Sequence, residues 1–273
     1  MKTRARLAGA LPCLALLLLI EFGSPWPPAK AAPEPVIRED LEYQVSLGPC
    51  TNAGRVHLVL KELEPGRYLA EVSGAAQGVW QLSKRWLPER YQTEMIHREG
   101  RLVPLVYREE FISEGKRVVK EYRFDHERGH LSLWRQAEGG EKVKKWEVPL
   151  KGPVYDPLTL FYNVRLGVFG PLPGGSTLRV TVLPSPAPQE MVFAIGAVSE
   201  IGRKVMLDYR RSESKAVKQY YFFLSPEQVP TLAWTQVPMF GKLTARLLNP
   251  GEIKKEGLLG HPPSPSPGLK AQP

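Results

Sequence analysis

The segment Asp156-Pro157-Leu158-Thr159-Leu160-Phe161-Tyr162-Asn163-Val164-Arg165-Leu166-Gly167 interrupts a chain that otherwise consists of alternating strands. Asp156 offers an N-cap carboxylate, Pro157 suits the first helical position, and Gly167 offers a stop. The spacing predicts a helix with two faces: Leu158, Phe161, Tyr162 and Arg165 on one, Leu160 and Val164 on the other. Because so short a helix is marginal alone, we expect it to pack on a sheet, either as a plug or lid over a concave β surface or as ordinary core.

On both sides of this helix, short segments alternate apolar and polar residues, as half-buried strands do. Turn residues such as Pro65-Gly66 separate them. The pattern predicts an all-β, mainly antiparallel domain over residues 41–250, built as one curved sheet or half-open barrel with one short packed helix. The expected strands are 41–45, 56–60, 68–72, 91–97, 105–112, 118–124, 130–135, 141–148, 177–183, 191–198, 204–210, 220–224, 231–237 and 242–248.

The first 31 residues have the pattern of a secretory signal peptide. Three basic residues precede an apolar run over 7–20, and Ala29-Lys30-Ala31 supplies a small-x-small cleavage site. The alternatives are an uncleaved anchor, for which the run is short of the roughly twenty residues required, and a lipoprotein based on Cys13, which lies within the run. We therefore expect a periplasmic or secreted protein, with a linker over 32–40 and a disordered Pro-rich tail over 251–273.

Charge and cysteine content narrow the function classes. Removing the signal takes away four basic residues and one acidic residue, so the net charge falls from +9 to about +6. Acids are interleaved with the bases, which is typical of a solvated surface, and we expect no nucleic-acid partner. Cys50 is the one cysteine after the signal, so no intramolecular disulfide can form. The domain must rely on a packed core for its stability.

No converging catalytic set is found in the sequence. His126 and His130 have a spacing that would suit zinc on a helix, but here it spans a hairpin turn, and we expect no metal and no cofactor. Glu109 and Glu110 are adjacent on a strand, so they point to opposite faces, and we expect both to be solvent-exposed. The pattern predicts a protein that is not an enzyme, the alternative being a hydrolase with an unrecognised carboxylate site.

Taken together, these segments resemble the domain-of-unknown-function 3108 family of exported bacterial proteins. The strongest piece is Asp156 to Arg165, which looks like that family's Asp-x-Leu-(small)-x-x-Tyr-x-x-Arg helix. The supporting pieces are Leu41-Glu42-Tyr43-Gln44-Val45, Pro65-Gly66-Arg67-Tyr68, Tyr122-Arg123-Phe124-Asp125, Val229-Pro230 and residues 240–247. The first turn, over 49–54, and Glu227 depart from the family pattern. The resemblance covers about residues 41–248 and implies a curved antiparallel β architecture in the cell envelope, without an established reaction.

A curved sheet has an inner face, and cavities in such folds commonly hold small apolar molecules. We therefore expect the protein to bind an apolar or lipid-like ligand, with Arg165, Phe161 and Tyr162 as candidate ligand-binding residues. Arg165 lies on an almost wholly apolar helix and must find either a core carboxylate or an anionic ligand group. The alternative is a non-catalytic envelope scaffold or interaction module. The candidate partners are a lipid or apolar small molecule and other envelope proteins.

Overall fold

The computed structural model describes residues 34–77, 90–113, 115–183, 187–210, 217–238, 240–253 and 258–259. Residues 1–31, the predicted signal peptide, lie outside this range, as do residues 260–273 of the predicted tail. Among the described residues, no helix is both long enough and apolar enough to cross a membrane.

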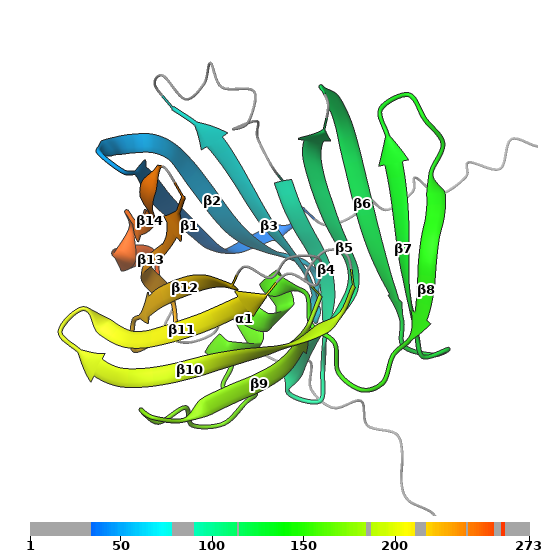
Figure 1. The fold of residues 1–273 in the computed structure, drawn as a ribbon. Helices are drawn as coiled ribbons and strands as arrows, with labels where there is room; N and C mark the ends of the chain where they lie inside the picture. Colours follow the sequence, from blue (N-terminus) through cyan, green and yellow to red (C-terminus); the bar gives the residue numbers. More distant parts are fainter. Residues whose placement is uncertain are drawn as a thin grey trace, which may run out of the picture. The chain divides into compact units, whose positions relative to one another are not determined.

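The described residues form one antiparallel sheet of 14 strands (Figure 1). Its order is β8-β7-β6-β5-β4-β3-β2-β1-β14-β13-β12-β11-β10-β9, so the strands make two meanders that are joined where β1 pairs with β14. The strands are β1 (Val36–Leu47), β2 (Cys50–Glu64), β3 (Arg67–Ala76), β4 (Arg90–Arg98), β5 (Arg101–Ser113), β6 (Lys116–Asp125), β7 (His130–Ala137), β8 (Val143–Pro149), β9 (Thr177–Val182), β10 (Gln189–Ser199), β11 (Gly202–Arg210), β12 (Val217–Leu224), β13 (Pro230–Val237) and β14 (Gly241–Leu247).

The expected fold class is confirmed, because the sheet is antiparallel, curved and not closed, and a single described α-helix packs on it. Each expected strand segment overlaps one strand of the structure. The first strand is longer than expected, however: β1 begins at Val36, inside the predicted linker. Val36 and Ile37 are exposed and pair with Glu62 and Lys61 through the backbone. Because this part of β1 has no buried face, its sequence does not alternate apolar and polar residues. The pattern therefore did not reveal that the strand starts at Val36.

Helix α1 (Pro157–Arg165) lies inside the curve of the sheet (Figure 1). Asp156 is its N-cap and accepts hydrogen bonds from the backbone N–H groups of Leu158 and Thr159. Leu158 and Tyr162 pack into a core cluster with residues of β1 to β5, whereas Leu160 packs into a second cluster with residues of β9 to β11. The helix therefore lies between the two meanders, with each predicted face against one of them.

The predicted disordered tail requires a correction at its start. Pro250–Glu252 form a short 3-10 helix, and Leu258 and Leu259 are buried in the same core cluster as Leu158. The Tyr68 hydroxyl donates a hydrogen bond to the backbone carbonyl of Leu259. Ile253 packs against the same cluster, so a few apolar side chains anchor a segment that is otherwise rich in polar residues and proline.

Candidate functional site

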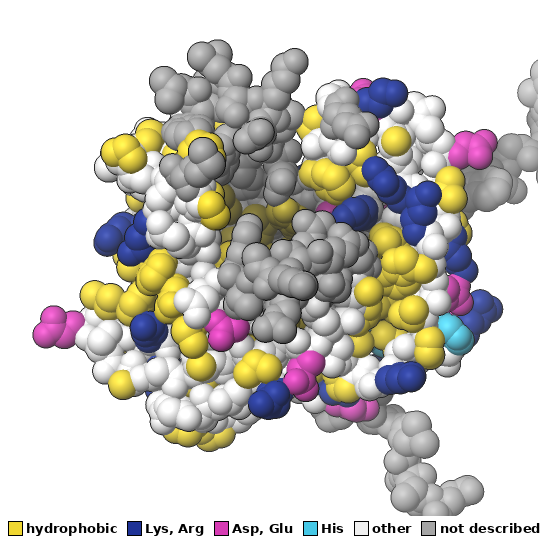
Figure 2. Space-filling view, viewed as in Figure 1, with side chains coloured by type: hydrophobic (Ala, Val, Ile, Leu, Met, Phe, Trp, Pro, Cys, Tyr) yellow, Lys and Arg dark blue, Asp and Glu magenta, His cyan; other side chains and the backbone are white. Residues whose placement is uncertain are grey.

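A cavity lies between α1 and the concave side of the sheet, and we call it the sheet–helix cavity. Its volume is about 500 Å³. In Figure 2, hydrophobic side chains are visible in the hollow between β2–β3 and β11–β12. The described lining consists of Tyr43, Val56, Leu58, Val72, Pro157, Leu158, Leu160, Phe161, Val164, Leu172, Leu178, Val182, Met191, Phe193, Ile195, Val205, Leu207, Phe222, Leu224, Gln228, Pro230, Ala233 and Ala245.

Strand alternation explains why this space is apolar, and two small residues explain why side chains do not fill it. Phe222 and Leu224 on β12 face the cavity, so the intervening Phe223 faces the opposite side of the sheet. Ala233 on β13 lies directly opposite Phe222 on β12 and directly opposite Ala245 on β14. Because both alanines end at Cβ, the two strands leave room that a larger side chain would fill.

Two lining residues have polar groups in their side chains. They are Tyr43 on β1 and Gln228 in the turn between β12 and β13. Gln228 has a positive φ of 60°, and its Oε1 atom is buried without a hydrogen-bond partner. No charged side chain belongs to the described lining of this cavity.

The three predicted ligand-binding residues occupy different environments. Phe161 lines the sheet–helix cavity. Tyr162 is fully buried in the core cluster beside β1 to β5 and is not part of the described lining. Arg165 also lies outside that lining and forms an ion pair with Glu39 on β1. Of the two partners considered for Arg165, the structure provides the core carboxylate.

Sequence reasoning missed the polar contacts that dock the helix on the sheet. Asn163 is fully buried and pairs with the backbone of Leu102 on β5, accepting from its N–H at 2.8 Å and donating to its carbonyl at 2.8 Å. The Thr93 hydroxyl on β4 donates to Asp156 Oδ1 at 2.7 Å. The sequence did contain a signal for these contacts. Asn163 is the one amide side chain in an apolar helix, and a buried amide needs hydrogen-bond partners.

Burial sets the ionisation of the groups around the helix. It raises the pKa of Asp156 above its ordinary value, against the hydrogen bonds from Thr159 and Thr93 that lower it. Burial also raises the pKa of Tyr162, and the neighbouring Glu39 carboxylate adds to this effect. Asp156 has hydroxyl and amide donors as neighbours, so its role is to cap α1 and fix it to β4.

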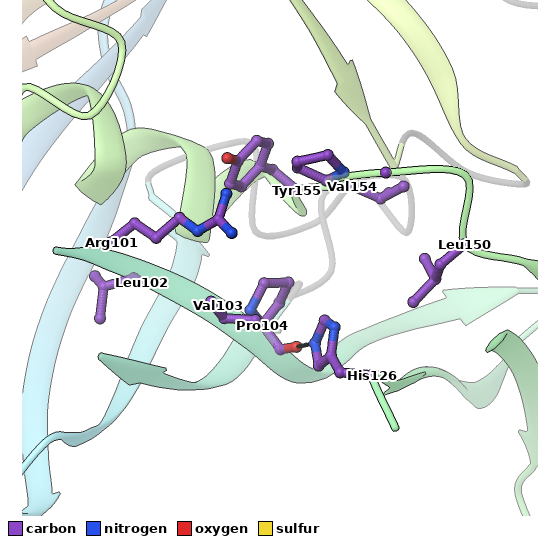
Figure 3. Close-up of a pocket in the computed structure, with 10 residues that line it drawn as sticks. Arg101, Leu102, Val103, Pro104, His126, Leu150, Val154 and Tyr155 are labelled. Carbon is purple, nitrogen blue, oxygen red and sulfur yellow. Dashed lines mark hydrogen bonds between the residues drawn. The ribbon is translucent and has the colours of Figure 1, made fainter. Parts of the chain in front are cut away.

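A smaller pocket of about 280 Å³ lies between β5, the turn after β6 and the segment that leads to α1 (Figure 3). Arg101 and Tyr155 lie on one side of it, and His126 lies on the other. The Nε2 atom of His126 is 2.6 Å from the carbonyl oxygen of Pro104. This contact fixes the imidazole at the wall of the pocket, and the rest of the described lining is mostly aliphatic.

The carboxylates that were expected to be solvent-exposed have structural roles instead. Glu109 is mostly buried and pairs with Lys120 at 3.4 Å, which corrects the expectation for this residue. Glu110 pairs with Arg117. The reason is that long basic side chains of neighbouring strands cover these acids on the sheet surface. Neither of the two pockets has a carboxylate in its described lining.

The described residues contain no group of three or more His, Cys, Asp or Glu side chains arranged to hold a metal ion. His126 lies in the turn after β6, whereas His130 begins β7 and pairs in register with Asp125. Cys50 is a free cysteine at the first position of β2, directly after the Gly48-Pro49 turn.

Fold and site together define a class of protein: a curved antiparallel sheet that encloses one helix and an apolar cavity. Residues 42–193 match the family described as "Protein of unknown function (DUF3108)", and the chain belongs to this family. The match ends within β10, so the late segments of the resemblance, 229–230 and 240–247, lie outside it.

No curated protein matches the chain. Among solved structures, the chain is similar to the crystal structure of a beta-barrel-like protein of domain of unknown function DUF1849 from Brucella abortus, with 9% sequence identity and a TM-score of 0.47. The similarity covers 78% of this chain and 96% of that one.

Proposed function

We propose that this protein binds an apolar or lipid-like molecule in the sheet–helix cavity. The observation that carries the proposal is the cavity itself, which combines a volume of about 500 Å³ with an almost wholly apolar lining. Ligand pockets are typically about 300–1,000 Å³ and are lined mainly by hydrophobic and aromatic side chains, with few polar groups. An apolar cavity of this kind holds apolar molecules in preference to water.

The proposed activity is binding rather than catalysis. General acid–base chemistry needs a titratable group within reach of the bound molecule. The described lining of the sheet–helix cavity offers none that titrates near neutral pH, since its polar groups are a phenol and an amide. The alternative, a hydrolase with a carboxylate site, requires acids that face a pocket, whereas the buried Asp156 and Glu39 face helix and strand partners.

The proposed location is the periplasm or the exterior of the cell, after removal of residues 1–31. Support comes from the basic, apolar and small-x-small order of the N-terminus. In such a location, a carrier or sensor of apolar molecules has lipids and their breakdown products within reach. N-terminal sequencing of the protein from an extracytoplasmic fraction should give Ala32 as the first residue, and a protein that keeps residues 1–31 in the cytoplasm would contradict the location.

Native mass spectrometry after gentle purification tests the proposed binding. We expect a co-purifying apolar molecule, or uptake of added fatty acid or phospholipid, that a Phe161→Asp variant loses because a charge enters the cavity lining. The matched control is Phe240→Asp, at an exposed phenylalanine outside that lining. A clean apo mass without any uptake would contradict the proposal and favour the envelope scaffold, in which exposed surfaces contact other proteins.

A further inference from the structure

We propose that the outer face of β11–β14 is a docking surface for a membrane that contains anionic lipids. This face lies on the side of the strands opposite to the sheet–helix cavity, because side chains alternate along a strand. Ala233 lines the cavity, and its neighbours Leu232 and Trp234 therefore face outward. The inference is independent of the proposed ligand binding, since none of the residues that carry it belongs to the described cavity lining.

The outward side chains at the centre of this face are apolar and partly exposed. Tyr221 on β12 lies directly opposite Trp234 on β13, and Phe223 on β12 lies opposite Leu232 on β13. Met206 on β11 lies opposite Tyr221 on its other side. All five residues are partly accessible to solvent, and we call them the outer patch. Contiguous apolar patches with a polar rim mark sites of protein or membrane interaction.

Four side chains from four neighbouring strands form a stack across the outer patch. The rings of Tyr221 and Trp234 are stacked, with centroids 4.0 Å apart and an angle of 14° between their planes. Lys204 Nζ on β11 lies 5.1 Å from the centroid of the Tyr221 ring, and Lys242 Nζ on β14 lies 4.3 Å from the centroid of the Trp234 ring. Because the strand order is β11-β12-β13-β14, each ring has the other ring on one face and a lysine on the other face.

The covered ring faces narrow the class of partner. A nucleic-acid base or a sugar ring binds an aromatic side chain by stacking on its face, and the faces of Tyr221 and Trp234 are already occupied. The ring edges and the lysine ammonium groups remain for a partner. Trp and Tyr are enriched at the membrane–water interface, where the ring is in apolar surroundings and its polar atom meets the head groups. Lysine side chains at such an interface extend their charge to the head groups.

The charge on this face is complementary to anionic lipids. Lys204, Lys242 and Arg246 are exposed beside the outer patch, and none of them forms an ion pair with a described acid. Asp208 is the one described acid that faces outward on β11–β14, and it accepts a hydrogen bond from Gln219 at 3.1 Å.

The acids that face outward on the adjoining strands are engaged by other residues. Glu190 on β10 pairs with Arg179, and Glu42 on β1 pairs with Arg55. The three basic side chains beside the outer patch are therefore available to lipid phosphates, and each Lys or Arg near an anionic surface contributes about 1 kcal/mol, which is about fivefold in affinity.

Co-sedimentation of the mature protein with sucrose-loaded vesicles tests the inference. The vesicles consist either of phosphatidylcholine alone or of phosphatidylcholine and phosphatidylglycerol in equal amounts. We expect the vesicles with phosphatidylglycerol to bind at least about tenfold more tightly. Lys204→Gln/Lys242→Gln should weaken this binding by about ten- to thirtyfold, because two charges that face the lipid are lost. The matched control is Lys116→Gln/Lys145→Gln, which removes two exposed lysines outside this face and should stay within about threefold, because salt screens distant charges.

A second measurement locates the contact. Vesicles of the same anionic composition with brominated acyl chains quench the fluorescence of a tryptophan that reaches them, and Trp234→Phe, which keeps an aromatic ring in the stack, should lose most of this quenching. The control is Trp134→Phe on β7, since Trp134 also lies beside two cations, Arg123 and Lys144. These cations, however, are paired with acids, and we expect this variant to be quenched as the unmodified protein is.

Four results overturn the proposal: no binding to either kind of vesicle, equal binding to both kinds, an equal loss in the two double-lysine variants, or equal quenching in the two tryptophan variants. Binding of poly-glutamate without binding of the anionic vesicles would also overturn it, and would assign the outer patch to an acidic protein partner. None of these results bears on the sheet–helix cavity, because the two surfaces share no residue.

Discussion

Arg165 donates from Nη1 to Oε2 of Glu39, and the two side chains are 2% and 0% exposed. The pair joins the C-terminal end of α1 to β1 across 126 residues of sequence. Removing one partner of a buried pair leaves an uncompensated charge, whereas replacing both with apolar residues is often tolerated. The ion pair therefore holds the helix in place beside the cavity.

We predict that Arg165→Met lowers the free energy of unfolding by about 3–5 kcal/mol, because it leaves Glu39 charged and buried. The double variant Glu39→Leu/Arg165→Met should recover most of this loss. Urea denaturation followed by circular dichroism measures both. The Glu39→Leu single variant is measured as well. If the double variant loses as much free energy of unfolding as the two single variants lose together, the residues do not act as a pair.

The N-cap of α1 gives a second prediction. Asp156→Ala removes the acceptor of two backbone N–H groups and of the Thr93 hydroxyl. The loss of stability should exceed the about 0.5–2 kcal/mol of an ordinary cap, because Thr93 also loses its partner. Asp125→Ala is the control, since Asp125 accepts from the Arg128 N–H in an exposed turn. Equal effects of the two substitutions on the urea midpoint would contradict this account of the helix.

Glu121 should make stability depend on pH below about 5. Its burial opposes ionisation, but hydrogen bonds from Lys142, Arg108 and Arg123 outweigh the burial and lower its pKa from 4.5 to about 2. A carboxyl whose pKa is lower in the folded state stabilises the fold above its unfolded pKa, and this contribution is lost as the pH falls from about 4.5 toward 2.

We therefore expect Glu121→Gln to reduce the loss of stability between pH 5 and pH 2–3, measured by urea denaturation at each pH. Glu190→Gln is the control, because it removes a carboxylate from an exposed pair with Arg179. If both substitutions change the pH profile equally, the ion-pair cluster around Glu121 does not carry the effect.

The C-terminal leucines give a fourth prediction. Deleting residues 258–273 removes Leu258 and Leu259 from the core, and burial of each leucine is worth about 1.5–3 kcal/mol. Deleting only residues 260–273 keeps both leucines and should leave stability nearly unchanged. The two truncated proteins can be compared by thermal denaturation, and equal midpoints would contradict the anchoring role of the leucines.

The strands and the capped helix could be predicted from the sequence because each of them has a local signal. Alternation marks a strand with one buried face, and Asp156-Pro157 marks the helix start. The start of β1 has no such signal, since Arg38-Glu39-Asp40 is held by pairing with β2 and by the Arg38–Glu62 ion pair. Leu258 and Leu259 were missed because the residues around them have the composition of a tail.

The candidate site was predictable only in part. The inner face of a curved sheet and Phe161 on the helix follow from periodicity. The cavity itself depends on contacts between distant segments, such as Ala233 beside Ala245 and the return of β14 to β1. Likewise, Arg165 required a partner, but only the fold identifies Glu39 as that partner and so separates Arg165 from the cavity.

The central claim, that the sheet–helix cavity is the binding site, is tested most directly by filling it. Ala233→Phe places a ring in the cavity from β13, whereas Leu232→Phe places the same ring one residue earlier, on the opposite face of the strand. The measurement is titration of N-phenyl-1-naphthylamine into each folded variant by fluorescence. We predict that Ala233→Phe loses at least about tenfold in affinity, a difference of about 1.4 kcal/mol, and that Leu232→Phe binds as the unmodified protein does. Equal binding by both variants would contradict the claim.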